Sequence, residues 1–328
     1  MSTDGHTLAG TDLTIPLMGV GTWAWGDKST WGMGGYDTDL DYDTITEAWR
    51  TSIDAGVTLF DTAEVYGKGE SERIIGRLRR DDPERATRAV IASKFMPQPW
   101  KLNVKRSLVA AARASVERLE VESIDLYQIH GPISLRGHAA LAEALAAAHA
   151  EGLVRAVGVS NYSASETRKM DAELRKRGLR LASNQIEFSL LRTMPETSGV
   201  LATCAELGVV PLAYSPIGQG RLTGKYSVAS PPPGKRNFSS HPMEKIDEIA
   251  AVQRRVGEAH DGKTPSQVAL NWIIAKGAVP IPGAKNGAQA ADNAGAVGWS
   301  LSSDEVAELD AVALGGLRSI SHRVWQHG

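Results

Sequence analysis

Cysteine is nearly absent from this chain of 328 residues, which has Cys204 alone. A single cysteine excludes an internal disulfide and any cysteine-rich metal site. No run approaches about 18 uninterrupted apolar residues, so we expect no membrane-spanning helix. The N-terminal residues lack the basic start and the long apolar stretch of a signal peptide. These absences predict a protein of the reducing cytoplasm, without a metal site.

An excess of either charge is also missing, because the formal net charge is −2. The balance gives no reason to expect nucleic acid or an anionic membrane as a partner. A hydrophobic content of 42% with 23% charged residues is typical of a globular protein. The alanine-rich segment 141–150 could be an oligomer contact or outer-layer packing. We favour packing, and therefore a monomer.

What the chain does contain is a repeated alternation of short apolar runs with segments of helical spacing. From residue 19 onward it gives about eight strand–helix units, a pattern typical of a parallel sheet. Over this length the units fit a closed (β/α)8 TIM barrel, which usually needs about 250 residues plus insertions. Two doubly wound domains are the competing architecture, but no linker-like break separates two halves. We predict a single domain, 1–328, with an N-terminal hairpin around 8–17 and extra C-terminal helices.

Three helix starts can be read from capping residues. Asn103 precedes an apolar stripe of helical spacing, and Thr264 precedes a proline at the first helical position. Ser302 with Glu305 forms a capping box, which predicts a last helix through Val312.

Two segments show neither helical nor strand spacing. Residues 227–242 are rich in Pro, Gly and Ser and predict a long loop, and loops of that length are usually functional. Residues 314–328 predict an irregular tail, in which Trp325 and His322 could cover the opening of the barrel.

Four polar residues follow the apolar runs 57–60, 89–92 and 124–129, which predict buried strands. Active sites of α/β folds assemble at the carboxyl ends of strands, so these side chains should meet there. Taken singly, each would more often be a cap, a packing residue or a solvated charge. The four are Asp61, Tyr66, Lys94 and His130.

Such a group is suited to reducing a carbonyl by hydride, which requires a proton and a positive field at the developing alkoxide. Tyrosine, with a pKa of about 10, is a poor acid at neutrality. We expect Lys94 to lower the pKa of Tyr66 and make it a better proton donor. Asp61 would pair with Lys94 and keep it charged. His130 would orient the carbonyl oxygen or help to move the proton.

These residues stand in motifs that resemble the aldo-keto reductase superfamily, over residues 8–312. The motifs, in the family's order, are DTAEVYG, SKF, IHG and GVSNY. The resemblance implies an NADPH-dependent (β/α)8 oxidoreductase whose catalytic residues are the four above, with Tyr66 as the general acid. Within the superfamily, the pyridoxal reductase type looks most similar, through GTWAWG, WGMGGY, FSLL, AYSPIGQGRLTGKY and VPIPGAKN.

No Rossmann or Walker motif is present, because the glycines at 19–21 and 218–225 have the wrong spacing. The resemblance instead implies a cofactor laid across the barrel mouth, with Tyr214 stacked on the nicotinamide ring. The carboxamide would be held by Ser160, Asn161 and Gln185. The pyrophosphate stretch would be Ser215, Ile217, Gly218, Gln219, Gly220 and Leu222, and the end of the first strand would contribute Gly21, Thr22 and Trp23.

The 2′-phosphate would lie near Lys285 and Gln289, and the adenine near Asp292 and Asn293. Many members of the family have an arginine where Gln289 stands, so Lys285 is the one obvious cation there. Lys235 or Arg236 in the long loop could supply a second charge. We therefore expect NADPH, with NADH as a possible substitute.

Four tryptophans are candidates for the substrate pocket: Trp23, Trp25, Trp31 and Trp100. Trp23 and Trp25 have strand spacing, so we expect both to face the barrel mouth. An aromatic lining favours a flat or hydrophobic carbonyl compound.

The predicted function is the reduction of an aldehyde or ketone, such as an aromatic aldehyde or pyridoxal, to the alcohol. One alternative is a cofactor-binding regulatory subunit with little turnover. A second is a barrel glycoside hydrolase that uses Glu64 and Glu187 as paired carboxylates.

Overall fold

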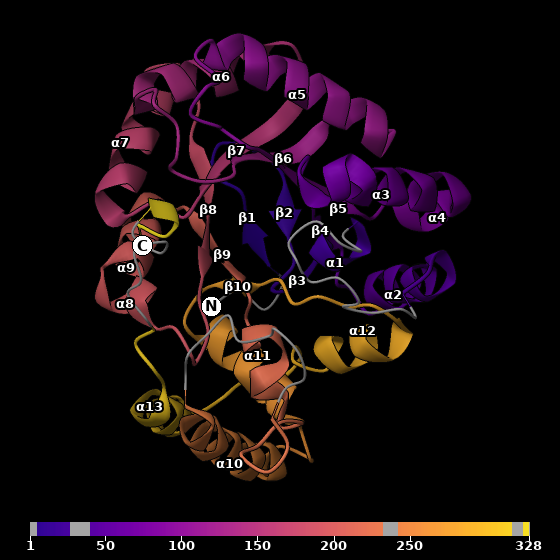
Figure 1. The fold of residues 1–328 in the computed structure, drawn as a ribbon, viewed down its shortest axis with the longest axis vertical. Coiled ribbons are helices and arrows are strands. Elements are labelled where there is room, and N and C mark those ends of the chain that lie inside the picture. Colours follow the sequence, from indigo (N-terminus) through magenta and orange to yellow (C-terminus); the bar gives the residue numbers. More distant parts are fainter. Residues whose placement is uncertain (1–4, 27–39, 232–241, 317–323, 328) are drawn as a thin grey trace.

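The fold is a parallel barrel surrounded by helices, seen in a computed structural model that describes residues 5–26, 40–231, 242–316 and 324–327 (Figure 1). Eight parallel strands follow one another around the barrel in sequence order. They are β3 (Gly19–Gly21), β4 (Leu59–Asp61), β5 (Val90–Phe95), β6 (Ile124–Ile129), β7 (Val154–Ser160), β8 (Leu181–Glu187), β9 (Val210–Tyr214) and β10 (Val279–Pro280). The predicted (β/α)8 architecture is confirmed.

The barrel closes between its first and last strands through a parallel bridge that pairs Gly21 with Gly283. The amide of Gly21 donates to the carbonyl of Pro282 at 2.9 Å. A Cβ at position 21 would lie 2.9 Å from the carbonyl oxygen of Ile281. Glycine is therefore required for the two strands to approach this closely.

One end of the barrel interior is plugged by the N-terminal hairpin, in which β1 (His6–Thr7) pairs antiparallel with β2 (Thr14–Ile15) (Figure 1). Leu8 and Ile15 are fully buried, in one apolar cluster with residues from the start of the strands, such as Leu59 and Leu126. The predicted hairpin is confirmed, with its strands slightly displaced along the chain. The hairpin closes the amino end of the barrel, and the opposite, carboxyl end is the one at which active sites of this fold assemble.

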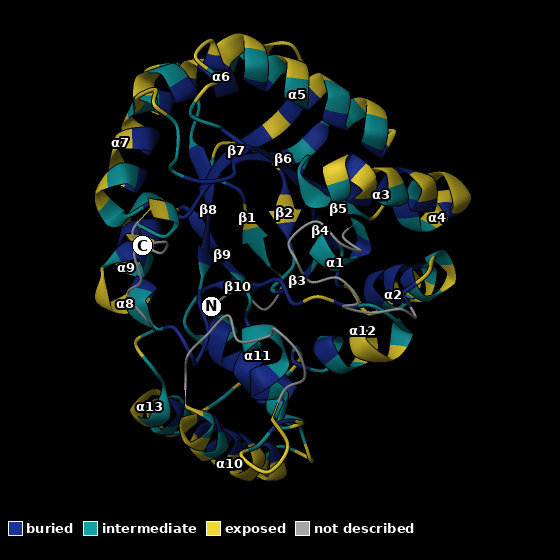
Figure 2. Ribbon diagram, in the orientation of Figure 1, coloured by how far each residue is buried: buried dark blue, intermediate teal, exposed yellow. Residues whose placement is uncertain are grey.

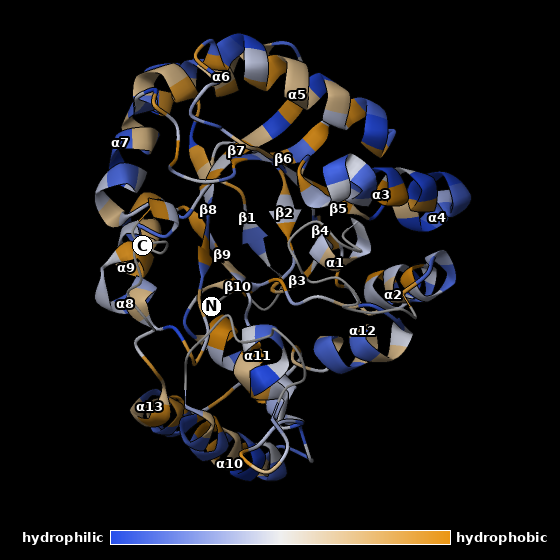
Figure 3. Cartoon of the chain, in the orientation of Figure 1, coloured by the Kyte–Doolittle hydropathy of each residue, from blue (hydrophilic) through white to orange (hydrophobic). Residues whose placement is uncertain are grey.

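Helices cover the outside of the barrel, with their buried sides against the strands and their polar sides outward (Figures 2 and 3). They are α1 (Trp23–Gly26), α2 (Tyr42–Asp54), α3 (Glu70–Asp81), α4 (Pro83–Ala86), α5 (Val104–Leu119), α6 (His138–Ala150), α7 (Ala164–Arg175), α8 (Met194–Thr197), α9 (Val200–Leu207), α10 (Met243–Ala259), α11 (Pro265–Ala275), α12 (Gly287–Ala294) and α13 (Ser303–Val312). Two 3₁₀ helices, η1 (Tyr66–Gly69) and η2 (Gly218–Thr223), lie in loops at the carboxyl end.

The capping residues perform as their sequence pattern predicts. The side chains of Asn103, Thr264 and Ser302 each accept a hydrogen bond from the backbone amide three residues later. Thr264 and Ser302 form complete capping boxes with Gln267 and Glu305.

The structure differs from the sequence interpretation at two places. Residues 19–25 were expected to form the first strand, but the strand ends at Gly21 and residues 23–26 form a helical turn, α1. Helix α10 was not predicted, although its buried residues Ile246, Ile249 and Val256 recur at helical spacing. Among the described residues, no helix is long and apolar enough to cross a membrane.

Candidate functional site

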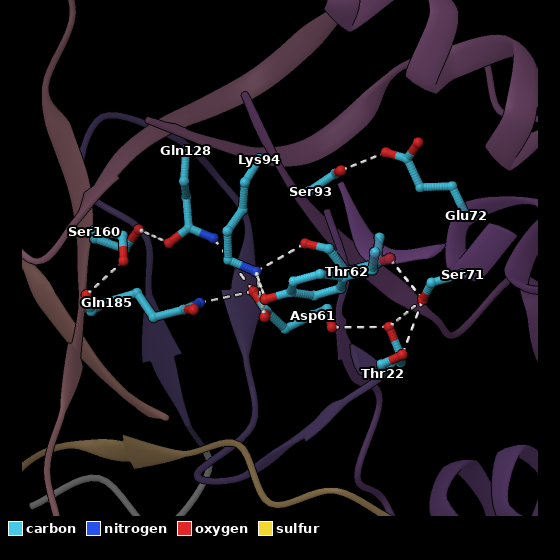
Figure 4. A network of polar contacts seen from close by, with 12 residues as sticks. Thr22, Asp61, Thr62, Ser71, Glu72, Ser93, Lys94, Gln128, Ser160 and Gln185 are labelled. Atoms are coloured by element: carbon cyan, nitrogen blue, oxygen red, sulfur yellow. Dashed lines mark hydrogen bonds and ion pairs between the residues drawn. The ribbon is translucent and has the colours of Figure 1, made fainter. Parts of the chain in front are cut away.

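The four residues predicted from the sequence meet at the carboxyl end of three adjacent strands. Asp61 is the last residue of β4, Lys94 is next to last in β5, and His130 directly follows β6. Tyr66 begins η1, in the loop after β4. Figure 4 shows Lys94 and Gln185 converging on Asp61.

Lys94 is the centre of this cluster, and none of its side chain is exposed. Its ammonium donates to Asp61 Oδ2 at 2.5 Å, to the carbonyl of Thr62 at 2.8 Å and to the hydroxyl of Tyr66 at 3.3 Å. These three acceptors satisfy its three protons. Burial alone would lower the pKa of Lys94, but Asp61 and Tyr66 together outweigh it and raise the pKa. Lys94 is therefore a permanent positive charge.

Asp61 is held from several sides. Its second oxygen, Oδ1, accepts from Gln185 Nε2 at 2.7 Å and from Gln128 Nε2 at 3.3 Å (Figure 4). The backbone carbonyl of Asp61 accepts from both the amide and the hydroxyl of Thr22, at 2.9 and 3.0 Å. These bonds fix the carboxylate, and the carboxylate fixes Lys94.

Tyr66 presents its hydroxyl to Lys94, but its pKa moves in the direction opposite to the expected one. Burial raises the pKa of Tyr66, and Asp61 adds to the increase; Lys94 lowers it by a smaller amount. Lys94 thus lowers the pKa of Tyr66 as expected, but the net pKa is raised because the burial of the hydroxyl has the larger effect. The consequence is a hydroxyl that stays protonated at neutral pH.

His130 completes the cluster as a neutral imidazole. Its ring lies edge-on to Tyr66, with 5.7 Å between the ring centroids, and its amide donates to the carbonyl of Phe95 at 2.8 Å. Burial, helped by the charge of Lys94, lowers the pKa of His130 well below its usual value. Its buried Nδ1 has no hydrogen-bond partner among the described residues. A neutral ring can orient a carbonyl oxygen without carrying a charge.

The residues expected at a nicotinamide carboxamide lie beside this cluster, at the ends of β7, β8 and β9. Ser160 Oγ and the amide of Asn161 both donate to the carbonyl of Gln185, at 2.9 and 2.8 Å. The hydroxyl of Tyr214 donates to Asn161 Oδ1 at 3.1 Å. Gln185 has a second contact that the sequence did not reveal, since its amide nitrogen is bonded to Asp61. Gln185 therefore connects the cluster around Lys94 with the residues expected at the carboxamide.

Strained backbone marks the same loops. Asn161 and Ser215 have φ angles of 63° and 50°, and Gln219 has 56°. Non-glycine residues with positive φ are uncommon and concentrate at functional sites.

The expected pyrophosphate segment forms η2, where Gly218 and Gly220 also have positive φ. In the structure as it stands, the amides of Gly218, Gly220 and Leu222 donate to carbonyls of the same loop, at 2.9, 3.0 and 3.2 Å. The side chain of Leu222 is fully buried in the core.

The expected adenine and 2′-phosphate residues lie at the start and along α12. Lys285 donates its amide to the side chain of Gln289 at 3.1 Å. Asn293 is buried and donates to the carbonyl of Gly283 at 3.2 Å, while Asp292 accepts from the hydroxyl of Thr264 at 3.0 Å. Asn293 thus joins α12 to the segment after β10, and Asp292 joins α12 to the start of α11.

The tryptophans are placed differently from the prediction. Trp25 is 2% exposed and donates its Nε1 to the carbonyl of Ala284 at 2.7 Å, so it belongs to the core. Since residues 23–26 are helical, Trp23 and Trp25 face different directions. Trp100 is 72% exposed and is not enclosed in a pocket. Trp31 lies outside the described residues, as do His322, Lys235 and Arg236.

The C-terminal tail supplies an aromatic residue that does reach the site. The ring of Trp325 lies 5.7 Å from that of His130, between centroids. A Cβ on Gly131 would come within 2.8 Å of the same indole, so a glycine is needed for the contact. Trp325 therefore lies against the catalytic cluster, on the side where the tail was expected to cover the opening.

Glu64 and Glu187, the pair considered for glycoside hydrolysis, are both engaged by neighbours. Glu64 accepts from the amide of Met96 at 2.8 Å. Glu187 lies 3.6 Å from the guanidinium of Arg192. Among the described residues, no group of three or more His, Cys, Asp or Glu side chains could hold a metal ion.

The donor set fits a nicotinamide. Amide and hydroxyl groups match the donors and acceptors of a carboxamide, and the tyrosine at the end of β9 offers a flat face. The unpartnered, buried Nδ1 of His130 is a polar atom that a bound molecule could satisfy.

Comparisons with known proteins agree with this geometry. The model of the aldo/keto reductase family matches residues 17–314. The chloroplastic pyridoxal reductase of Arabidopsis thaliana is 37% identical, over 96% of this chain and 87% of the relative. An uncharacterized oxidoreductase of Mycobacterium tuberculosis is 38% identical, over 88% of this chain and 86% of the relative.

Solved structures are similar over the whole barrel. A glycerol dehydrogenase of Gluconobacter oxydans is 26% identical, with a TM-score of 0.80 over 98% of this chain and 99% of that one. An aldo/keto reductase of Klebsiella pneumoniae, crystallised with NADP and acetate, is 25% identical, with a TM-score of 0.71 over 97% and 98%. These relatives overturn the glycoside hydrolase alternative. The chain belongs to the aldo/keto reductase family and is an NAD(P)H-dependent oxidoreductase.

Proposed function

We propose that this protein reduces an aldehyde or ketone to the alcohol with NADPH, and that Tyr66 is the general acid. The observation that supports this most is the hydroxyl of Tyr66 at 3.3 Å from the buried ammonium of Lys94. A protonated phenol beside a permanent cation is a proton donor placed in a positive field. Its catalytic partners are Asp61, Lys94 and His130.

The bound nicotinamide supplies the hydride, and the protein's own groups perform the rest. The Tyr66 hydroxyl gives its proton to the oxygen of the carbonyl. Lys94 stabilises the phenolate that remains, and Asp61 keeps Lys94 in place. Neutral His130 donates a hydrogen bond that orients the carbonyl oxygen. The pKa of Tyr66 is raised by burial, and the positive charge of Lys94 counteracts this rise. The same charge favours loss of the proton to the carbonyl oxygen.

Ser160, Asn161, Gln185 and Tyr214 would hold the nicotinamide, and η2 would lie along the pyrophosphate. Preference for NADPH over NADH rests on Lys285 and on structural relatives crystallised with NADP and with NADPH. The remaining cofactor residues proposed from the sequence are Gly21, Thr22, Trp23, Gln289, Asp292 and Asn293.

The proposed substrate is an aromatic aldehyde such as pyridoxal. Trp325, His130 and Tyr66 place three aromatic rings in succession, with 5.7 Å between neighbouring centroids. Such rings favour a flat molecule. The pyridoxal reductase of Arabidopsis thaliana among the relatives supports the same class.

A screen of carbonyl compounds with NADPH, followed at the nicotinamide absorbance, tests the proposal. We expect steady oxidation with 4-nitrobenzaldehyde and with pyridoxal. Cofactor binding without turnover of any aldehyde would instead support the regulatory-subunit alternative. A single domain over residues 1–328, a monomeric state and a cytoplasmic location are parts of the same proposal.

A further inference from the structure

The last described residues of the chain form a strap across the barrel mouth. Trp325 packs on His130 after β6, and the amide of His327 donates to the carbonyl of Asn161 after β7, at 3.1 Å. The imidazole of His327 also lies 2.9 Å from the carboxylate of Glu166 on α7. Between them, Gln326 reaches the ends of β8 and β9.

The side-chain nitrogen of Gln326 bonds both a tyrosine hydroxyl and a carboxylate. Its Nε2 donates to the hydroxyl of Tyr214 at 2.8 Å and to the carboxylate of Glu187. Both protons of the amide are then used, and the orientation of the amide is fixed, because the reverse orientation would place its oxygen against a carboxylate. Its Oε1 is buried and has no partner among the described residues.

The chain of bonds continues from Tyr214 to Asn161. Burial and the neighbouring Glu187 raise the pKa of the Tyr214 hydroxyl, so it keeps its proton. That single proton goes to Asn161 Oδ1, at 3.1 Å. Gln326 donates to the hydroxyl oxygen of Tyr214, so the hydroxyl accepts on one side and donates to Asn161 on the other. The bond from the same nitrogen to Glu187 holds Gln326 in the orientation that this arrangement needs.

We infer that Gln326 is a positioning residue for the nicotinamide: it holds the Tyr214 ring and, through the Tyr214 hydroxyl, the Asn161 side chain. This inference rests on the proposed function of Tyr214 and Asn161 as cofactor residues. Gln326 acts through Tyr214 and Asn161. Its own Oε1 is a further buried acceptor beside Tyr214.

Titration of the full chain with NADPH, followed by quenching of tryptophan fluorescence, tests the inference without any turnover. Loss of one such bond should raise the Kd of Gln326→Leu by roughly fivefold to tenfold. Val324→Ala is the matched control, because Val324 lies in the same strap and is 60% exposed. Its Kd should equal that of the wild type. The melting temperature of each protein without cofactor checks that the fold is retained.

Two further variants separate positioning from simple packing. Gln326→Glu has the same shape but places a second carboxylate beside Glu187, so its Kd should be higher at pH 8 than at pH 6. Tyr214→Phe keeps the ring and removes the hydroxyl. If the bonds act in series, Gln326→Leu should add little to the effect of Tyr214→Phe.

Wild-type affinity in both Gln326→Leu and Gln326→Glu would overturn the inference and leave the proposed function intact. Fully additive effects of Gln326→Leu and Tyr214→Phe would overturn it as well. Absence of NADPH binding to the wild-type protein would overturn the proposed function and this inference together.

Discussion

The ammonium of Lys94 lies 2.5 Å from the carboxylate of Asp61, and the two side chains are 0% and 3% exposed. A buried ion pair of this kind contributes little net stability, but removing one partner leaves an unpaired charge in the interior. The pair is therefore maintained by geometry that is costly to break, and that geometry also holds the hydroxyl of Tyr66.

Asp61→Asn should destabilise the fold, because Lys94 would then be a buried cation without its counter-ion. We expect the free energy of unfolding to fall by about 3–5 kcal/mol, measured by urea titration. The double variant Asp61→Asn, Lys94→Met should recover part of the loss. Lys105→Met is the control, since the Lys105–Glu143 pair is about half exposed and should change stability by less than about 1 kcal/mol. Equal losses in Asp61→Asn and Lys105→Met would contradict the account.

The lowered pKa of His130 makes stability depend on pH. The unfolded chain binds a proton near the usual value of 6.5, whereas the folded protein resists it until a lower pH. The part of the free energy of unfolding that depends on neutral His130 is therefore fully present above pH 6.5. It is lost as the pH falls from there toward the lowered pKa of His130 in the folded protein. His130→Gln should lack this loss. Parallel melting curves between pH 5 and pH 8, compared for the two proteins, measure the difference; identical pH dependence would refute a buried neutral imidazole.

The elements that the sequence predicts well are those specified by local chemistry. Thr264 and Ser302 cap their helices through backbone amides three residues away, and β6 has the bounds read from its apolar run. The four catalytic candidates could be located because each follows such a run. In a parallel barrel the carboxyl ends of all strands lie at one end, so residues that follow neighbouring strands are expected to meet there.

The predictions that failed depend on distant contacts. Trp23 and Trp25 have the spacing of a strand, yet they stand in a helical turn, and Trp25 lies in the core with its Nε1 bonded to the carbonyl of Ala284. The net direction of the Tyr66 pKa shift is set by the burial of its hydroxyl, which outweighs the effect of Lys94 and which sequence order does not reveal. No pattern in the tail marks Gln326 as a partner of Tyr214, because that contact spans 112 residues.

Lys285→Ala should weaken NADPH binding more than NADH binding, because only NADPH carries the 2′-phosphate that this cation would pair with. We expect the KM for NADPH to rise by roughly tenfold relative to that for NADH, since a charge-assisted bond is worth about 1.5–3 kcal/mol. Lys285→Arg keeps the charge and should retain the preference. Steady-state kinetics with both cofactors measures the ratio, and an equal rise for both would disprove the phosphate contact.

Trp325→Ala should reduce selectivity for aromatic aldehydes, because it removes the ring that lies over His130. The KM for 4-nitrobenzaldehyde should rise by roughly fivefold to tenfold, while the KM for a short aliphatic aldehyde should change little. The neighbouring, exposed Val324→Ala should leave both unchanged. A parallel rise for the two aldehydes would show that Trp325 does not select for aromatic substrates.

The central claim is that the Tyr66 hydroxyl gives the proton, and Tyr66→Phe tests it most directly, because phenylalanine keeps the ring and removes only the oxygen. Single-turnover reduction of 4-nitrobenzaldehyde by the NADPH-bound protein should slow by about 100-fold to 10,000-fold, with the Kd for NADPH unchanged. Single-turnover reduction at the wild-type rate in Tyr66→Phe would contradict the account.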